Sequence, residues 1–157
     1  MRRLLAPVLV AGALVVPSQA AAAGEGRLQV RVTGAAAGVM AGCRGVDVAR
    51  IGRSALGFVV YKFHVVKRWC WAFPRVTSVT TYAYASDIDP NWDYKGVIAA
   101  NGYFYRWCCG DGRSGHYSFR QGKFENCVFT LGCIRREYPW VKIWVRADGG
   151  YSYATGT

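Results

Sequence analysis

Acidic residues and histidines are scarce in this 157-residue chain. It has 9 Asp and Glu against 20 Lys and Arg, a formal net charge of +11, and only two histidines. Most of the acids lie in segments predicted to be turns, so nothing indicates the paired carboxylates of a glycosidase. C-x-x-C spacing is also missing, which argues against a zinc site built from Cys108, Cys109, Cys127, Cys133 or His116.

Long apolar runs are absent except near the N-terminus. Arg2 and Arg3 precede an apolar stretch over residues 4–16, and a series of small residues follows it. This order is typical of a secretory signal peptide. The stretch is shorter than the ~20 residues that a transmembrane helix needs, and no second one follows. We therefore predict a signal peptide over residues 1–23, cleaved between Ala20 and Gly24, and a secreted, extracellular protein without a transmembrane segment.

Residues 24–157 are predicted to form one extracellular β domain. Loss of Arg2 and Arg3 leaves 18 Lys and Arg against 9 Asp and Glu, a net charge of +9. A chain of this length can bury one hydrophobic core. Its six cysteines are expected to form disulfides, because the extracellular compartment is oxidising.

Val, Tyr, Phe, Trp and Thr dominate the chain from Phe58 onward, and these residues favour strands. Leu28, Val30 and Val32 alternate with polar residues, which predicts an earlier strand. Residues 34–45 are predicted to be a loop, and 46–57 fit neither a helix nor a strand well. Further strands are expected at 58–73, 76–85, 97–107, 116–119, 123–129, 140–146 and 151–154, with a turn at Gln121-Gly122. The predicted fold is all-β, an antiparallel sandwich or small barrel of about seven short strands.

The cysteine spacing suggests one set of disulfides. Cys108 and Cys109 are adjacent at a predicted strand end, so their side chains should point to opposite faces and reach different partners. Cys127 and Cys133 flank a short loop and could pair with each other. That pairing would leave Cys43 and Cys70 for the adjacent pair, although six cysteines allow 15 connectivities.

Residues 87–93 read DIDPNWD and place oxygen ligands on alternate positions, as in the first half of a calcium loop. The match then fails, because position six is Trp92 instead of Gly and position twelve is Ile98 instead of Glu. A turn with side-chain-to-backbone hydrogen bonds explains the same residues, and we favour it.

The two histidines are His64, in a predicted strand, and His116, after a glycine-rich loop that contains Ser114. A hydrolase would need His116 to meet a hydroxyl such as that of Ser114 and an orienting acid in a cleft. The loop lacks the G-x-S-x-G turn. The sequence therefore favours a protein that is not an enzyme and needs no cofactor.

Aromatic and basic residues alternate with aliphatic ones over 140–146. Val141, Ile143 and Val145 should form one face of a strand, and Trp140, Lys142, Trp144 and Arg146 the other. Flat indole rings stack on sugar rings or bases, and the cations suit anionic polymers. These four residues are the predicted ligand-binding site, with core packing as the alternative.

A second aromatic series is Tyr61, Phe63, Trp69, Trp71 and Phe73, for which a core role is favoured over binding. Nucleic acid is another partner that a basic domain suggests. Because the basic residues are scattered along the chain, we rank nucleic acid below a glycan.

The chain also contains the motifs Trp69-Cys70-Trp71 and Tyr138-Pro139-Trp140. Over more than half of its length it resembles small exported bacterial proteins of unknown function that carry W-C-W early and Y-P-W late. This resemblance implies secretion and an all-β fold.

The sequence thus predicts a secreted, non-enzymatic binding module for an anionic or glycan polymer, such as a polymer of the cell envelope. Two alternatives stay open. One is a secreted effector, either a protein inhibitor or an antibacterial toxin, and the other is a hydrolase.

Overall fold

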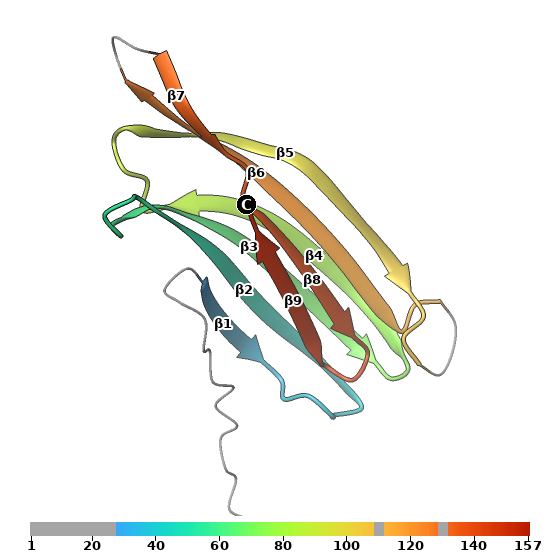
Figure 1. Ribbon diagram of the computed structural model, residues 1–157. Coiled ribbons are helices and arrows are strands. Elements are labelled where there is room, and N and C mark those ends of the chain that lie inside the picture. The colour runs from blue at the N-terminus through green and yellow to red at the C-terminus, as the bar shows by residue number, and fades with distance from the viewer. Residues whose placement is uncertain (1–27, 109–111, 129–131) are drawn as a thin grey trace, which may run out of the picture.

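The computed structural model describes residues 28–108, 112–128 and 132–157. They form two antiparallel sheets that pack face to face as a sandwich (Figure 1). This part of the chain contains no helix, and so none that is long and apolar enough to cross a bilayer. The all-β sandwich expected from the sequence is confirmed.

The first sheet, sheet A, has the order β1-β2-β3-β4, and the second, sheet B, has the order β5-β6-β8-β9 with β7 paired to one end of β6. In Figure 1, β7 and the end of β6 extend beyond the body of the sandwich. Sheet A consists of β1 (Leu28–Gly34), β2 (Ala41–Arg53), β3 (Val59–Ala72) and β4 (Arg75–Ser86). Sheet B consists of β5 (Trp92–Tyr105), β6 (Gly115–Val128), β7 (Gly132–Glu137), β8 (Trp140–Arg146) and β9 (Tyr151–Gly156).

The described residues form nine strands, and several are longer than predicted. Strand β2 includes residues that the sequence left undecided and others that it assigned to a loop. It pairs with β1 on one side and β3 on the other, so sheet pairing determines its structure where the local sequence pattern is weak.

The predicted turn at Gln121-Gly122 is wrong, because β6 continues through it. A Cβ atom at position 122 would lie 2.7 Å from the ring of Phe63. The glycine therefore makes room for a buried aromatic ring instead of reversing the chain. Strand β7 was missed because its residues are mostly exposed and lack apolar alternation.

The core lies between the two sheets and is rich in aromatic residues. Tyr61 stacks on Phe124 at 3.9 Å between ring centroids. Trp69 and Trp71 are also buried, whereas Phe73 lies beyond the end of β3 and is exposed. The second aromatic series therefore belongs to the core, except for its last member.

Two disulfides are present in the described residues. Cys127–Cys133 is confirmed, but the assignment of Cys43 and Cys70 to the adjacent cysteines is wrong, because these two bond to each other. They lie directly opposite each other in the β2–β3 register, although the sequence assigned Cys43 to a loop. Cys109 lies outside the described residues.

The two disulfides should differ in what they contribute to stability, because they close loops of different length. Their cysteines are 27 and 6 residues apart. Replacing Cys43 and Cys70 with Ala should lower the free energy of unfolding by ~3–4 kcal/mol, and replacing Cys127 and Cys133 by ~2 kcal/mol. Urea unfolding of both double variants measures the difference. Equal losses, or a larger loss for the shorter loop, would contradict the loop-entropy explanation.

Candidate functional site

The predicted binding residues lie together on the outer face of sheet B. In β8, Val141, Ile143 and Val145 are fully buried in the core. Trp140, Lys142, Trp144 and Arg146 alternate with them and are partly exposed. The alternation in the sequence thus places all four on one solvent-facing side of the strand.

Neighbouring strands extend this face with more aromatic rings. Tyr103 of β5, Tyr117 of β6 and Trp144 of β8 are partners in register across the sheet. The ring centroids of Tyr103 and Tyr117 are 4.9 Å apart, and those of Tyr117 and Trp144 are 5.3 Å apart. The three rings form a continuous aromatic row across sheet B, which the sequence analysis missed because it depends on strand register.

The cations of this face lie beside aromatic rings. Lys142 Nζ is 5.0 Å from the ring centroid of Trp140, and the guanidinium carbon of Arg146 is 4.6 Å from that of Trp107. Gly156 lies opposite Trp140, where a Cβ atom would come within 2.5 Å of the indole. The missing side chain lets the indole lie close over β9. We call Trp140, Lys142, Trp144, Arg146 and the aromatic row the outer aromatic face.

A basic cavity of about 340 Å³ adjoins the Trp140 end of this face. Two of its lining residues, Tyr138 and Thr157, flank the Trp140–Gly156 pair along the chain. Arg50 Nε–H in the same cavity is buried and donates no hydrogen bond to the described residues. The arginines that line the cavity are Arg50, Arg53, Arg135 and Arg136.

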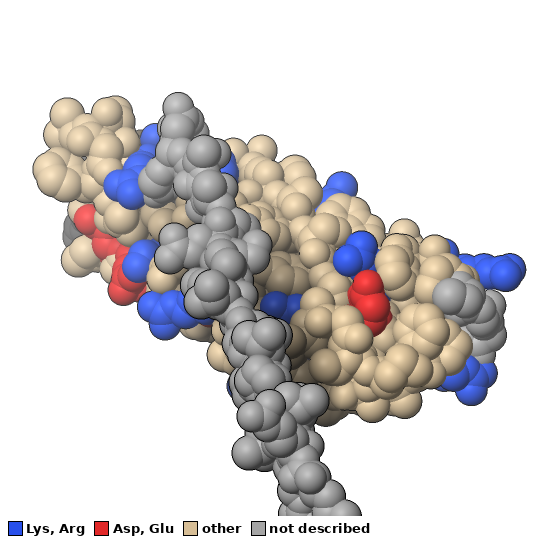
Figure 2. Space-filling model, turned by 90° about the horizontal axis from the view of Figure 1, so that it is seen from below, with Lys and Arg blue, Asp and Glu red and all other residues tan. Residues whose placement is uncertain are grey.

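Elsewhere, basic residues are spread over the surface. Figure 2 shows one side of the molecule, on which Lys and Arg are distributed among uncharged residues and the acids gather in two places. This distribution agrees with the scatter of basic residues along the chain.

A buried lysine connects the two sheets. Lys67 of β3 is fully buried, and its Nζ donates to Ser118 Oγ at 2.9 Å and to the carbonyl oxygens of His116 at 2.9 Å and Ile143 at 3.2 Å. His116 Nδ1 lies 3.0 Å from the same nitrogen. Burial, with a smaller effect of Arg120, lowers the pKa of Lys67 to about 7. Burial and the nearby Lys67 lower the pKa of His116 to about 4, so His116 is neutral and accepts at Nδ1.

A hydrolase site around His116, the alternative that the sequence left open, would need a hydroxyl and an orienting acid. His116 lies 3.4 Å from Ser118 Oγ at a cavity, but no carboxylate among the described residues contacts it. Ser118 is only 1% exposed. Ser114 Oγ instead accepts a hydrogen bond from the backbone N–H of Trp107 at 2.8 Å. The arrangement anchors one sheet to the other.

His64 contacts both a carboxylate and a hydroxyl. Its Nδ1 lies 3.1 Å from both carboxylate oxygens of Asp47, and its Nε2 lies 3.0 Å from Ser86 Oγ. The three residues come from β2, β3 and the last position of β4. The sequence indicates His64 in a strand but not its partners, because these depend on the register of sheet A.

Residues 87–93 form a turn, as the favoured interpretation predicts. Asp89 Oδ1 accepts hydrogen bonds from the backbone N–H and the side-chain amide of Asn91. Asp87 pairs with Lys62, and Asp93 pairs with Lys95. The three carboxylates thus have separate partners instead of sharing one ligand site, and β5 begins at Trp92.

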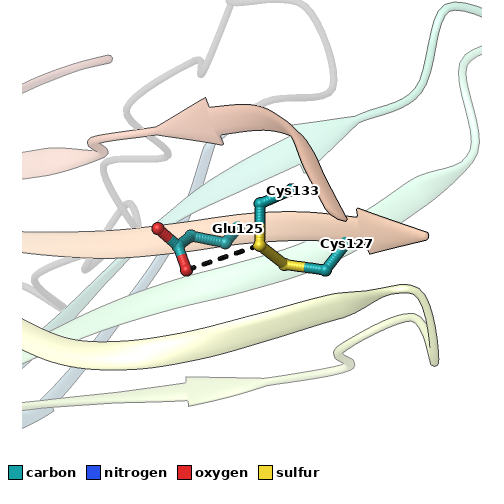
Figure 3. Close-up of side chains that lie close together, drawn as sticks. All are labelled: Glu125, Cys127 and Cys133. Carbon is teal, nitrogen blue, oxygen red and sulfur yellow. Dashed lines mark hydrogen bonds between the residues drawn. A yellow bond between two sulfur atoms is a disulfide. The ribbon is translucent and has the colours of Figure 1, made fainter. Parts of the chain in front are cut away.

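One group of possible metal ligands, Glu125, Cys127 and Cys133, lies at the far end of β6 (Figure 3). The two sulfurs bond to each other, so neither offers a thiolate to a metal. Cys133 Sγ lies 3.9 Å from Glu125 Oε2, a contact without a thiol proton. Glu125 is already paired with Lys123 at 2.8 Å and Arg136 at 3.1 Å, and these cations lower its pKa. The group is a disulfide beside a neutralised carboxylate.

Comparison of the chain with family models, with curated proteins and with solved structures finds no match. The assignment of a function therefore depends on the geometry alone.

The buried Lys67 and His116 should make stability depend on pH. Both have a lower pKa in the folded state, so between the folded and the ordinary values the unfolded chain binds more protons. The free energy of unfolding should therefore rise with pH from about 4 to 6.5 through His116, and from about 7 to 10.5 through Lys67. Denaturant titrations across these ranges measure the slope.

The matched variant is Lys67→Met, which keeps the aliphatic stem and removes the ammonium. It should flatten the slope between about pH 7 and 10.5, whereas Lys142→Met on the outer face should not. A wild-type slope in Lys67→Met would show that another group is responsible.

Proposed function

We propose that this chain is an exported binding module whose outer aromatic face holds an anionic glycan polymer, such as an acidic polysaccharide of the cell envelope. The proposal rests on one observation: the aromatic row and the predicted binding residues share one partly exposed surface. These residues are Trp140, Lys142, Trp144 and Arg146. Apolar rings in the core are shielded from ligands, but these rings reach solvent.

The chemistry of this face fits both parts of an acidic sugar polymer. The rings of Tyr103, Tyr117 and Trp144 follow one another across three strands, so successive sugar rings could stack on them. Lys142 and Arg146 place positive charge beside the rings, where carboxylate, sulfate or phosphate groups of the polymer would lie. The arginine-lined cavity next to Trp140 adds positive charge at one end.

Export is part of the same proposal. Its support is the signal-like N-terminus and the two disulfides, which are consistent with an oxidising compartment. A glycan of the envelope or the surroundings is then a polymer that the folded domain would meet.

The tryptophans should supply most of the affinity. Trp140→Ala combined with Trp144→Ala should weaken retention on an acidic polysaccharide at least about tenfold, because each stacked ring is worth ~1 kcal/mol. Affinity electrophoresis with the polysaccharide in the gel measures the change. The matched control is Phe58→Ala with Tyr82→Ala, which removes two exposed rings elsewhere. Unchanged retention in the tryptophan variant would exclude this face as the site.

The two cations should determine the salt dependence. Lys142→Gln with Arg146→Gln should weaken binding at low salt and make the loss of affinity with added salt less steep, because exposed charges are screened. Arg31→Gln with Arg68→Gln, on the opposite sheet, should leave the salt dependence as in the wild type. Retention on DNA equal to that on the polysaccharide at each salt concentration would reduce the interaction to general charge attraction.

A further inference from the structure

A serine, a histidine and an aspartate meet on the outer face of sheet A, away from the outer aromatic face. His64 lies in the middle strand of the three that contribute, with Asp47 on one side and Ser86 on the other. Asp47 contacts Nδ1 of the imidazole and Ser86 contacts Nε2, at 3.1 and 3.0 Å. The two partners therefore use different ring nitrogens.

This use of both nitrogens has a chemical consequence. An ionised Asp47 only accepts, so the Nδ1 proton points at it and Nε2 keeps a lone pair. The lone pair can then accept the hydroxyl proton of Ser86. Hydroxyl, imidazole and carboxylate thus have the order in which a general base activates a nucleophile and an acid orients the base.

Tyr84 holds the other members in place. Its ring stacks on the imidazole of His64, with centroids 4.5 Å apart and an angle of 7° between the planes. Its hydroxyl lies 3.3 Å from Asp47 Oδ2 and donates to it. One side chain thus fixes both the plane of the base and the position of the acid.

The surroundings of Ser86 are polar, and Lys62 and Asp87, which pair with each other at 2.6 Å, lie beside it. Ser86 is partly exposed at the end of β4, and the next residue, Asp87, adopts a left-handed φ of 49°, which turns the chain away. Lys62 lies directly opposite Ser86, so both side chains are on the same face.

We propose that Ser86, His64 and Asp47 form an acyl-transfer site that hydrolyses small carboxylic esters, an activity separate from the proposed binding on sheet B. Ser86 Oγ attacks the ester carbonyl carbon while His64 Nε2 takes the hydroxyl proton. The tetrahedral intermediate expels the alcohol, which leaves with that proton, and an acyl group stays on Ser86. Water, deprotonated by His64, then releases the carboxylic acid and restores the serine.

Two features select this substrate class. Ser86 is partly exposed, and an ester releases an alkoxide or phenoxide more readily than an amide releases an amine.

The experiment uses the full folded protein with two probes, a fluorophosphonate and 4-nitrophenyl acetate. Peptide mass spectrometry should find one phosphonyl group on Ser86, and phosphonylation should abolish ester hydrolysis. Ser86→Ala should give no adduct, and its hydrolysis should fall at least tenfold. Asp47→Asn, which preserves shape, should lower hydrolysis by about 10²-fold or more through the wrong imidazole tautomer.

The matched control is Ser78→Ala, which removes an exposed serine from the same strand. This variant should hydrolyse the ester and react with the fluorophosphonate like the wild type. The Trp140→Ala, Trp144→Ala variant should do the same, so the esterase proposal and the binding proposal can fail separately. Labelling at another residue, or equal hydrolysis by wild type and a folded Ser86→Ala variant, would overturn the proposal.

Discussion

The period-two alternation of β3 and β8 determines which side chains reach the two outer faces of the sandwich. Inward residues of the two strands, such as Phe63 and Ile143, are completely buried between the sheets. Because a strand cannot turn one side chain without turning its neighbours, burial of these residues forces the intervening ones outward. The outward set in β8 carries the aromatic rings and cations, and the outward set in β3 carries Lys62 and His64. Packing of the core thus determines the positions of both candidate sites, although core residues belong to neither site.

Lys67 places a fully buried charged group between the two sheets. Its ammonium has no acidic partner among the described residues and instead donates to a hydroxyl and to carbonyl oxygens of two strands in the other sheet. A buried charge without a counter-ion is costly. Its acceptors, however, occupy fixed places on β6 and β8, so only one alignment of the sheets satisfies them. A buried polar group of this kind specifies the register of the sandwich more than it adds stability.

The sequence predicted the features that depend on neighbouring residues, and it missed those that depend on strand pairing. Alternation alone identified β8 and the shared face of Trp140 and Trp144, and the residue types indicated an all-β fold. The sequence did not reveal the Cys43–Cys70 disulfide, because these cysteines meet only through the β2–β3 register. For the same reason, the sequence showed His64 in a strand but not Asp47, 17 residues away, or Ser86, 22 residues away. Gly122 looked like a turn because the ring that occupies its space, Phe63, comes from the other sheet.

The two outer faces of the sandwich therefore differ in chemistry for one structural reason. On sheet B, small residues of β9, such as Gly156 and Ala154, face the same side as Trp140 and Lys142, so the large side chains remain accessible from the edge of the sheet. On sheet A, the residues around His64 are polar and bond to one another, so the imidazole is held in one orientation by Tyr84, Asp47 and Ser86. An open surface of rings suits a ligand that is long and repetitive, whereas a fixed set of three polar groups suits a reaction at one atom. Since the core separates the two faces, a substitution on one can change its chemistry without disturbing the other.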